Sequence, residues 1–286
     1  MPRYTDSEGR TTLLQDDFIK SKVLIPQQDC IITSPPYNLG IAYGSTDDFI
    51  PWEQYEEFSY EWMSKCFDIA ADTGRFCLNI PLDSLKGGAK PVYARLVKIA
   101  EECGWNYHTT IWWAEDNITK RSAWGSWLKA SAPYAITRCE MIAVFYKGTW
   151  KKSHDGVSTI TKKEFLEYTN GKWAFNGERK KVYTLDDGSK ISHPASYPLE
   201  LPSRLIKLFT FEDDCVFDPF AGTGTTLLAA RELGRYGLGF DIDEAYCQLA
   251  AKRLDLKKDK HAVSNTKSVK RTTLPTITRQ SHLRAL

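Results

Sequence analysis

The chain has 286 residues and a formal net charge of +2, with 38 Lys and Arg against 36 Asp and Glu. Hydrophobic residues make up 42% and charged residues 26% of it, which excludes collagen-like, coiled-coil and wholly disordered proteins. This length predicts one large domain, or one domain with an insertion. No apolar run approaches the roughly 18 residues that span a bilayer, and Met1–Asp6 lacks the apolar region of a secretion signal. We therefore expect no membrane association and a cytoplasmic location.

Cysteine usage and charge distribution narrow the class further. The seven cysteines include no Cys-x-x-Cys pair, and His108 and His154 have no ligand partners at metal spacing, so we expect neither a disulfide framework nor a metal site. Residues 257–286 carry eight Lys and Arg and one acid, Asp259, which leaves residues 1–256 mildly acidic, with 30 bases and 35 acids. The composition of this basic tail predicts a disordered segment. A loose electrostatic tether for DNA is the alternative.

Two kinds of element alternate along the first half of the chain. Short apolar runs predict buried strands, and apolar residues at helical spacing predict amphipathic helices. In chain order these are a strand within Val23–Thr33, a helix over Trp52–Ala71, a strand over Gly74–Ile80, a helix over Pro91–Cys103, and strands over Tyr107–Trp113 and Glu140–Tyr146. The alternation predicts an α/β protein with a mostly parallel sheet.

The composition changes after Lys147. Residues 148–190 combine many Lys and Arg with aromatic side chains, which predicts an inserted subdomain rather than more sheet. Three prolines follow within His193–Pro202. Apolar patterning then predicts a helix over Ser203–Phe209, a strand over Cys215–Phe217, a helix that ends at Leu233, a strand over Tyr236–Phe240 and a helix over Glu244–Leu256.

A glycine-rich loop follows the first strand of this second half. Gly222-x-Gly224 stands between a strand and a helix, where backbone N–H groups can approach a ligand. A P-loop would need a Lys after Gly224, and a dinucleotide fingerprint would need a third glycine where Leu227 stands. Asp218 before the glycines and Asp241 after the next strand instead suit a cationic ligand that has ribose hydroxyls. S-adenosylmethionine fits that description.

A second loop, Ser34-Pro35-Pro36-Tyr37, follows the first predicted strand. Two consecutive prolines hold the backbone rigid and leave no N–H of their own. The Ser34 hydroxyl and the Pro35 carbonyl can accept the hydrogens of an exocyclic amino group, and the Tyr37 ring offers a flat face for stacking. An ordinary proline turn is the alternative, but the ligand-type glycine loop elsewhere in the chain favours a binding site.

Together these segments resemble those of the β class of DNA amino-methyltransferases. Ile32–Tyr37 is similar to the catalytic motif of that class and Asp218–Thr226 to its S-adenosylmethionine motif, with the catalytic motif first in the chain. The resemblance covers most of residues 11–256. It implies an α/β fold with a doubly wound, mostly parallel sheet of the S-adenosylmethionine-dependent methyltransferase type, in circularly permuted motif order, within a domain of residues 1–256. Residues 148–190 stand where this class places its target-recognition region.

The resemblance also implies the site residues. The expected catalytic residues are those of the proline loop: Ser34, Pro35, Pro36 and Tyr37. The expected cofactor-binding residues come from five separate segments: Asp17, Thr33, His193, Pro194, Ser196, Asp218, Pro219, Phe220, Ala221, Gly222, Thr223, Gly224, Thr225, Thr226 and Asp241. Among these, Asp241 is expected to hold the ribose and Asp17 to face the adenine, with Asp16 standing where the class usually has Gly.

The first residue of the catalytic motif indicates the target base. Ser34 is similar to the form typical of N4-cytosine enzymes, whereas Asp is commoner there in N6-adenine enzymes. The resemblance therefore implies methyl transfer from S-adenosylmethionine to cytosine N4 in duplex DNA, after the base flips out of the helix. N6-adenine is the alternative target. No Pro-Cys dipeptide occurs, which disfavours methylation at cytosine C5.

Duplex DNA is the expected partner, and Arg179 is the one arginine of residues 148–190 that could make a bidentate contact with guanine. The family also implies a homodimer and a separate cognate restriction endonuclease. Two rival classes are disfavoured. A non-catalytic DNA-binding relative would be expected to have degraded loops, whereas Ser34–Tyr37 and Gly222–Gly224 are intact. An NAD-dependent dehydrogenase would need the third glycine.

Overall fold

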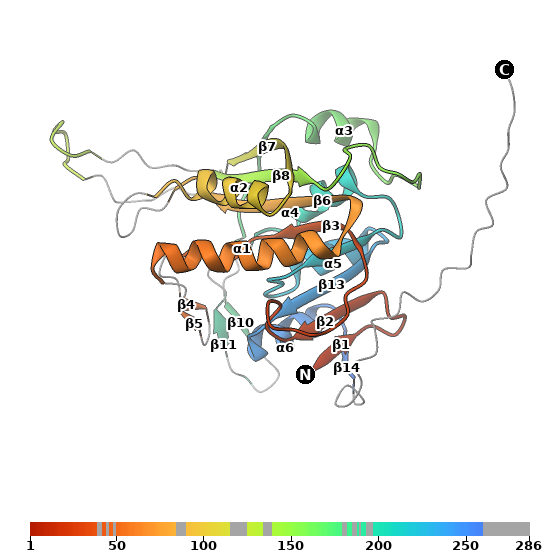
Figure 1. The fold of residues 1–286 in the computed structure, drawn as a ribbon. Coiled ribbons are helices and arrows are strands. Elements are labelled where there is room, and N and C mark those ends of the chain that lie inside the picture. The colour runs from red at the N-terminus through yellow and green to blue at the C-terminus, as the bar shows by residue number, and fades with distance from the viewer. Residues whose placement is uncertain are drawn as a thin grey trace, which may run out of the picture.

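The computed structural model describes residues 1–38, 42–43, 46–47, 50–83, 90–114, 125–133, 139–178, 182–184, 188, 190–192 and 197–259. A ten-stranded sheet with helices on both faces forms the body of the protein (Figure 1). The α/β class and the doubly wound architecture expected from the sequence are thereby confirmed. No helix in the described part of the chain is long and apolar enough to cross a membrane.

The sheet is parallel at its centre and antiparallel toward both edges. The five central strands run parallel in the order β2 (Thr11–Gln15), β13 (Tyr236–Asp241), β12 (Cys215–Asp218), β3 (Gln28–Thr33) and β6 (Ala70–Pro81). Next to β6 lie β8 (Cys139–Tyr146), β7 (Asn106–Ala114) and β9 (Lys172–Ala174), of which β8 is antiparallel to both of its neighbours. Next to β2 lie the antiparallel strands β1 (Arg3–Thr5) and β14 (Lys257–Lys258).

The helices form a layer on each side of the sheet. One face is covered by α1 (Trp52–Ile69) and α2 (Val92–Glu102). The other is covered by α4 (Glu200–Phe209), α5 (Thr225–Glu232) and α6 (Glu244–Arg253), with the short α3 (Lys162–Tyr168) packed on α4. Two small hairpins complete the described structure: β4 (Ala42–Tyr43) with β5 (Thr46–Asp47), and β10 (Val182–Thr184) with β11 (Lys190–Ser192).

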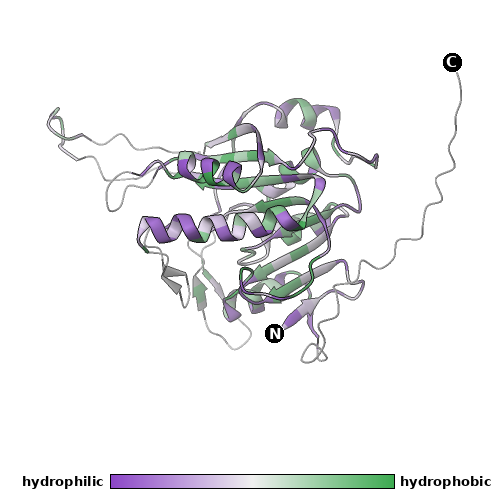
Figure 2. Cartoon of the chain, viewed as in Figure 1, coloured by the Kyte–Doolittle hydropathy of each residue, from purple (hydrophilic) through white to green (hydrophobic). Residues whose placement is uncertain are grey.

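Burial on both faces explains the apolar character of the central strands. In β3, Ile31 packs in the core under α1 and α2, whereas Cys30 and Ile32 pack against α4 and α5 on the other side. Figure 2 shows the same pattern, with hydrophobic strands between helices whose outer faces are hydrophilic. A parallel strand between two helical layers needs apolar side chains at every position, so its sequence is a continuous apolar run.

Several short strands were not expected from the sequence, and two of them concern the expected insertion and the expected tail. Residues 148–190 contribute β9 to the main sheet, with Trp173 buried, although no further sheet was expected there. Lys257 and Lys258, the first residues of the expected tail, pair with β1. β9 is three residues long and begins with a lysine, and β14 consists of two lysines. Neither strand has an apolar run from which it could be predicted. Residues 260–286 lie outside the described part of the chain.

Candidate active site

The candidate site lies where the carboxyl ends of the central parallel strands meet, as is general for ligand sites in such sheets. β3 ends at Thr33 and leads into Ser34–Tyr37, and its neighbour β12 ends at Asp218 and leads into the glycine loop. Thr33 Oγ1 donates to Asp218 Oδ1 at 2.7 Å. This hydrogen bond directly joins the two sequence motifs, although 185 residues separate its partners in the chain. The carboxyl edge lies at the left of Figure 1, where α1 begins.

The glycine loop turns sharply before α5. Gly222 and Gly224 have φ angles of 51° and 79°, in the left-handed region that glycine adopts without strain. A Cβ at Gly224 would lie 2.9 Å from Leu254 Cδ1 and 3.1 Å from Ala250 Cβ, so the packing of α6 also requires glycine there. Gly224 is the N-cap of α5 and makes no side-chain cap. The N-terminal N–H groups of α5 therefore face the loop without a capping side chain from that position.

Asp218 has its hydrogen-bonding capacity taken up within the protein. It is 1% exposed, and its carboxylate accepts hydrogen bonds from four groups: Thr33 Oγ1, Phe220 N, Thr226 Oγ1 and Tyr197 OH. Burial raises the pKa of Asp218, and these four donors oppose the rise. Asp218 therefore shapes the loop, and its expected place beside a cationic ligand stays a prediction.

Asp241, at the end of β13, has capacity left for a ligand. Gly222 N donates to its Oδ2 at 2.7 Å and Asp243 N to its Oδ1 at 2.9 Å. Each carboxylate oxygen can accept a further hydrogen bond. Burial raises the pKa of Asp241 to about 6, against the opposing effect of the two N–H groups. An acceptor of this kind beside a glycine loop fits the ribose hydroxyls of S-adenosylmethionine.

Asp17 lies just beyond β2, at the same edge of the sheet. Its carboxylate accepts a hydrogen bond from Ile19 N at 3.0 Å and forms an ion pair with Lys20 at 2.9 Å. Burial raises the pKa of Asp17, but the contacts with Lys20 outweigh burial and lower it. The preceding residue is tied to the end of β13, because Asp16 N donates to the Asp241 backbone carbonyl at 3.0 Å. The structure thus brings Asp17 close to the site with its carboxylate engaged in its own turn.

The proline loop is anchored in the core. Pro35 is buried, and the Pro36 carbonyl accepts a hydrogen bond of 2.7 Å from Tyr55 OH on α1. Tyr37 is 5% exposed and packs in the core under α1, while its hydroxyl forms a hydrogen bond with Ser34 Oγ. The open stacking face expected of Tyr37 is therefore not present in this conformation. Because the ring fills space in the core, only its hydroxyl reaches Ser34.

Two residues that the sequence analysis did not single out complete this cluster. Asn79 Nδ2 lies 3.4 Å from Ser34 Oγ and 3.2 Å from Tyr37 OH, and it also donates to Glu140 Oε2. Tyr37 OH lies 3.3 Å from the same Glu140 oxygen. Asn79 could have been noticed in the sequence, because a polar amide side chain is unusual inside a buried strand such as β6. Glu140 could not, because a charged residue near the start of a strand is common.

The remaining predicted residues are in two groups. Those of the glycine loop share one turn: Phe220 packs its ring against Trp62, and Thr223 accepts hydrogen bonds from Arg253 through its carbonyl and its hydroxyl. Pro219, Ala221, Thr225 and Thr226 belong to the same turn and the start of α5. His193, Pro194, Ser196 and Arg179 lie outside the described residues.

The expected recognition region is divided between the two ends of the strands. β9 runs parallel to β7 and ends beside Ala114, so residues 172–174 approach the carboxyl edge. Trp150, by contrast, stacks on His108 near the start of β7, with ring centroids 3.4 Å apart. α3 packs on α4 through an ion pair between Glu164 and Lys207. Much of the region thus lies toward the amino ends of the strands, away from Ser34.

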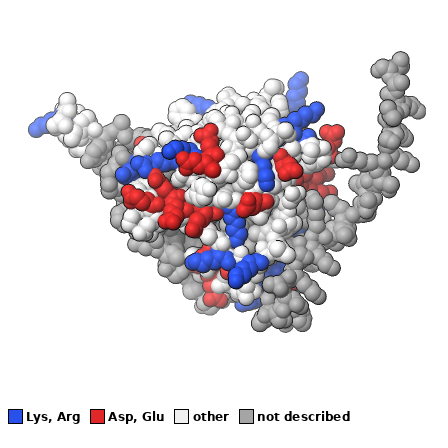
Figure 3. Space-filling model, viewed as in Figure 1, with Lys and Arg blue, Asp and Glu red and all other residues white. Residues whose placement is uncertain are grey.

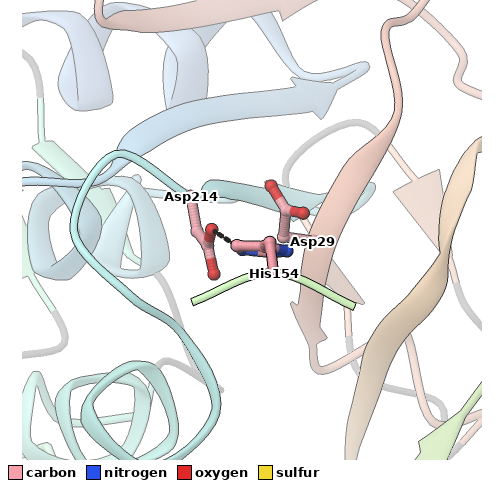
Figure 4. Close-up of side chains that lie close together, drawn as sticks. All are labelled: Asp29, His154 and Asp214. Carbon is pink, nitrogen blue, oxygen red and sulfur yellow. Dashed lines mark hydrogen bonds and ion pairs between the residues drawn. The ribbon is translucent and has the colours of Figure 1, made fainter. Parts of the chain in front are cut away.

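The amino edge also holds two carboxylates and a histidine (Figure 4). The possible ligand atoms of Asp29, His154 and Asp214 lie within 4.8 Å of one another, a proximity that their spacing in the sequence did not reveal. Asp214 pairs with His154 at 3.0 Å and with Lys152 at 3.0 Å, and Asp29 accepts a hydrogen bond from Cys215 N at 2.8 Å. Because Lys152 supplies positive charge at Asp214, we describe the group as an ion cluster that joins the starts of β3 and β12.

Comparisons with known proteins agree on one class. Residues 28–252 match the family described as DNA methylase, with N6- and N4-methyltransferases in its name. The chain is 53% identical over 170 residues to the type II methyltransferase M.MjaVI of Methanocaldococcus jannaschii, an alignment that covers 59% of this chain and 88% of that protein.

Solved structures give the same result. TTHA0409 of Thermus thermophilus, described as a DNA modification methylase, superposes with a TM-score of 0.62 at 26% identity, over 84% of this chain and 92% of that one. A structure of TTHA0409 with S-adenosyl-L-methionine is also similar, with a TM-score of 0.63. The cytosine-N4-specific PvuII DNA methyltransferase has a TM-score of 0.65 over 89% of this chain and 88% of that one, but at 17% identity this likeness concerns the fold alone.

Proposed function

Because the chain belongs to the DNA methylase family of N6- and N4-methyltransferases, we propose that it methylates the exocyclic N4 amino group of cytosine in duplex DNA. Family membership carries the coarser statement: the protein is a type II DNA amino-methyltransferase that uses S-adenosylmethionine. The choice of base, the flipping of that base and the individual site residues are the additional content of the proposal.

One observation carries the assignment of the site. The hydrogen bond of 2.7 Å from Thr33 to Asp218 holds the proline loop and the glycine loop at adjacent strand ends. A ligand on the glycine loop and a planar base at Ser34 would therefore lie side by side. Holding two reactants in a fixed geometry removes much of the entropy cost of their reaction.

The cofactor would lie along the glycine loop. Asp241 would accept hydrogen bonds from its ribose hydroxyls, and Asp17 would lie toward its adenine. His193, Pro194 and Ser196 would hold its methionine end, as the family resemblance implies. S-adenosylmethionine supplies an electrophilic methyl group bonded to a sulfonium sulfur. The protein residues position it and exclude water.

Ser34 and Pro35 would bind the target amino group. The Ser34 hydroxyl and the Pro35 carbonyl accept its two hydrogens, which turns the nitrogen lone pair out of conjugation and toward the methyl group. This is electrostatic preorganisation, and no covalent bond to the protein is needed. Since the amino group lies within the stacked duplex, the base must flip out first, at a cost of a few kcal/mol. Ser at the first position of the motif favours cytosine over adenine.

Nucleoside mass spectrometry tests this function. Mixed genomic duplex DNA is incubated with the protein and methyl-labelled S-adenosylmethionine, then digested to nucleosides. Label in N4-methylcytosine is the expected result. Label in N6-methyladenine would overturn the choice of base and keep the enzyme class.

Ser34→Ala is the matched active-site variant for this experiment. Removal of one aligned polar group should lower the methylation rate roughly 10²–10³-fold, as for the loss of one oxyanion-hole donor. Calorimetry with S-adenosylmethionine should give unchanged affinity in the variant. A near-normal rate in Ser34→Ala would remove Ser34 from the mechanism.

A further inference from the structure

A partly buried carboxylate, that of Glu140, is linked to the proposed methylation site. Glu140 lies in β8 opposite Pro81 of β6, and Asn79 lies in β6, the strand next to β3. This strand order brings Asn79 and Glu140 up to the proline loop from the side away from the glycine loop. The cofactor and the carboxylate therefore lie on opposite sides of Ser34.

The contacts form a continuous chain of oxygen atoms. Ser34 Oγ is hydrogen-bonded to Tyr37 OH, and Tyr37 OH lies 3.3 Å from Glu140 Oε2. The same phenolic oxygen also lies 3.3 Å from the backbone carbonyl oxygen of Asn79. Each hydroxyl in the chain can accept one hydrogen while it donates another. A path for a proton thus runs from Ser34 through Tyr37 to Glu140.

Methylation of an amino group creates a need for such a path. When the target nitrogen gains a bond to the methyl carbon, it becomes positively charged and must lose one of its hydrogens. Ser34 accepts a hydrogen bond from that nitrogen in the proposed function but cannot keep a proton. Water has little access to the middle of the path, since Tyr37 is 5% and Asn79 1% exposed, whereas Ser34 and Glu140 at its ends are partly exposed. A proton acceptor linked to Ser34 would therefore assist the reaction.

We propose that Glu140 receives the proton that the target amino group loses, through the hydroxyls of Ser34 and Tyr37. This inference rests on the proposed function. The nitrogen–methyl bond forms as the sulfur–methyl bond breaks. The amino N–H bond breaks and its proton goes to Ser34 Oγ, the Ser34 proton goes to Tyr37, and the Tyr37 proton goes to Glu140 Oε2. Ser34 and Tyr37 end as neutral hydroxyls, Glu140 ends as a carboxylic acid, and it returns its proton to solvent after the product leaves.

Asn79 positions the acceptor. Its amide nitrogen donates to Glu140 Oε2, and a carboxylate would repel an amide oxygen there, so the amide orientation is determined. The second hydrogen of the same nitrogen is directed between Ser34 and Tyr37, at 3.4 and 3.2 Å. Asn79 therefore holds Ser34 and Glu140, the two ends of the proposed proton path, in position relative to each other. Its Oδ1 is buried without a hydrogen-bond partner among the described residues.

The other titratable groups near Glu140 are few in the described residues. Tyr37 faces it from the proline loop, and Cys139 precedes it in β8. Burial raises the pKa of Cys139, and the charges of Asp83 and Glu140 add to that effect. Trp113, its partner on β7, carries no titratable group. A change in the methylation rate at low pH can therefore be assigned to Glu140 by comparing the pH profile of the wild-type protein with that of Glu140→Gln.

Glu140→Gln is the central variant, since it preserves size and hydrogen bonding and removes the basic carboxylate. Single-turnover methylation is measured with labelled S-adenosylmethionine on a duplex that carries the site located by the wild-type protein. We expect a loss of roughly 10²-fold, the lower range for general-base catalysis. With S-adenosylmethionine kept saturating at every pH, so that protonation of Asp241 does not limit binding, the wild-type rate should fall at low pH as the Glu140 carboxylate takes up a proton. This fall should be absent from Glu140→Gln.

Tyr37→Phe interrupts the same path at its middle. The single variant should lose about as much rate as Glu140→Gln, and the double variant should be no slower than the slower single variant, because both changes remove one shared path. Glu102→Gln on α2, an exposed partner of Lys98, is the matched control and should keep the wild-type rate. Cofactor affinity and thermal unfolding of each variant show whether it is folded.

Two results would overturn the relay. The first is a rate within about threefold of wild type in folded Glu140→Gln, with the wild-type pH profile retained. The second is a double variant whose losses multiply, which would mean that Tyr37 and Glu140 act separately. If the wild-type protein methylates no amino group in any DNA, the proposed function fails and the relay fails with it.

Discussion

The three carboxylates proposed for the cofactor site differ in how much hydrogen-bonding capacity the protein leaves open. Asp218 accepts from four protein donors, and Asp17 is engaged by Ile19 and Lys20. Asp241 accepts from two backbone N–H groups only, as far as the described residues show. At the scale of single residues, Asp241 is therefore the carboxylate best suited to take hydroxyl hydrogens from a ligand.

Cofactor affinity should depend on pH through Asp241. Burial raises the pKa of Asp241 to about 6, so below that pH its carboxyl group is protonated and accepts ribose hydroxyls less well. We expect affinity for S-adenosylmethionine to fall by up to about tenfold per pH unit below the pKa, since binding must then release one proton. Calorimetry at several pH values from 5 to 8 measures this.

Asp241→Asn is the control for that dependence. The variant should bind more weakly at pH 8 and show a flat pH profile, whereas an unchanged slope would assign the titration to another group. The free protein should respond in the opposite direction. A raised folded pKa stabilises the protonated form, so the contribution of Asp241 to stability is present at low pH and is lost as the pH rises through about 6.

At the scale of elements, the glycine loop depends on how closely α6 approaches it. Gly224 combines a left-handed backbone with a Cβ position only 2.9 Å from Leu254. Two separate requirements thus act on one residue: one comes from the turn and the other from packing. The second cannot be seen in the motif itself, because α6 follows the loop by about 20 residues in the chain.

Gly224→Ala and Gly234→Ala separate these requirements. Gly234 also has positive φ, at 77°, but a Cβ there would meet nothing within 4 Å. Gly234→Ala should cost about 1–2 kcal/mol for the left-handed backbone. Gly224→Ala should cost a further ~1–3 kcal/mol for overpacking against α6, and it should weaken cofactor binding. Chemical denaturation measures both, and equal costs would contradict the packing argument.

At the scale of the whole molecule, the two ends of the parallel strands serve different purposes. The carboxyl ends carry the proposed site, and the amino ends are joined by the ion cluster of Asp29, Lys152, His154 and Asp214. The face covered by α1 and α2 carries acidic and basic side chains side by side, with no continuous basic surface over its described residues (Figure 3). We therefore expect DNA to approach the carboxyl edge instead of this face.

The two aspartates of the ion cluster should affect stability in opposite directions. Asp214→Asn leaves the Lys152 ammonium, whose side chain is only 10% exposed, without its charged partner, which should cost about 3 kcal/mol. Burial, together with the charge of Asp214, raises the pKa of Asp29, so its ionised form is unfavourable and its contribution is lost as the pH rises through its folded pKa. Asp29→Asn should thus be neutral or stabilising at pH 7. Denaturation of both variants at pH 5 and 7 checks the signs, and a destabilised Asp29→Asn would contradict them.

The sequence by itself determined the fold class, the two motif loops and their meeting point. Continuous apolar runs mark strands buried on both faces, and parallel strands place the loops that follow them at one edge. Ser34 and Asp241 could be found in this way because each directly follows such a run.

Only the tertiary structure decided which groups are engaged and which remain open. Asn79 and Glu140 reach Ser34 because β6 lies beside β3 and β8 lies beside β6, an order set by packing. Asp218 is saturated and the Tyr37 ring is buried because residues distant in the chain surround them. Hydrogen-bond saturation and burial depend on neighbours that folding brings together from distant segments, and local sequence does not record them.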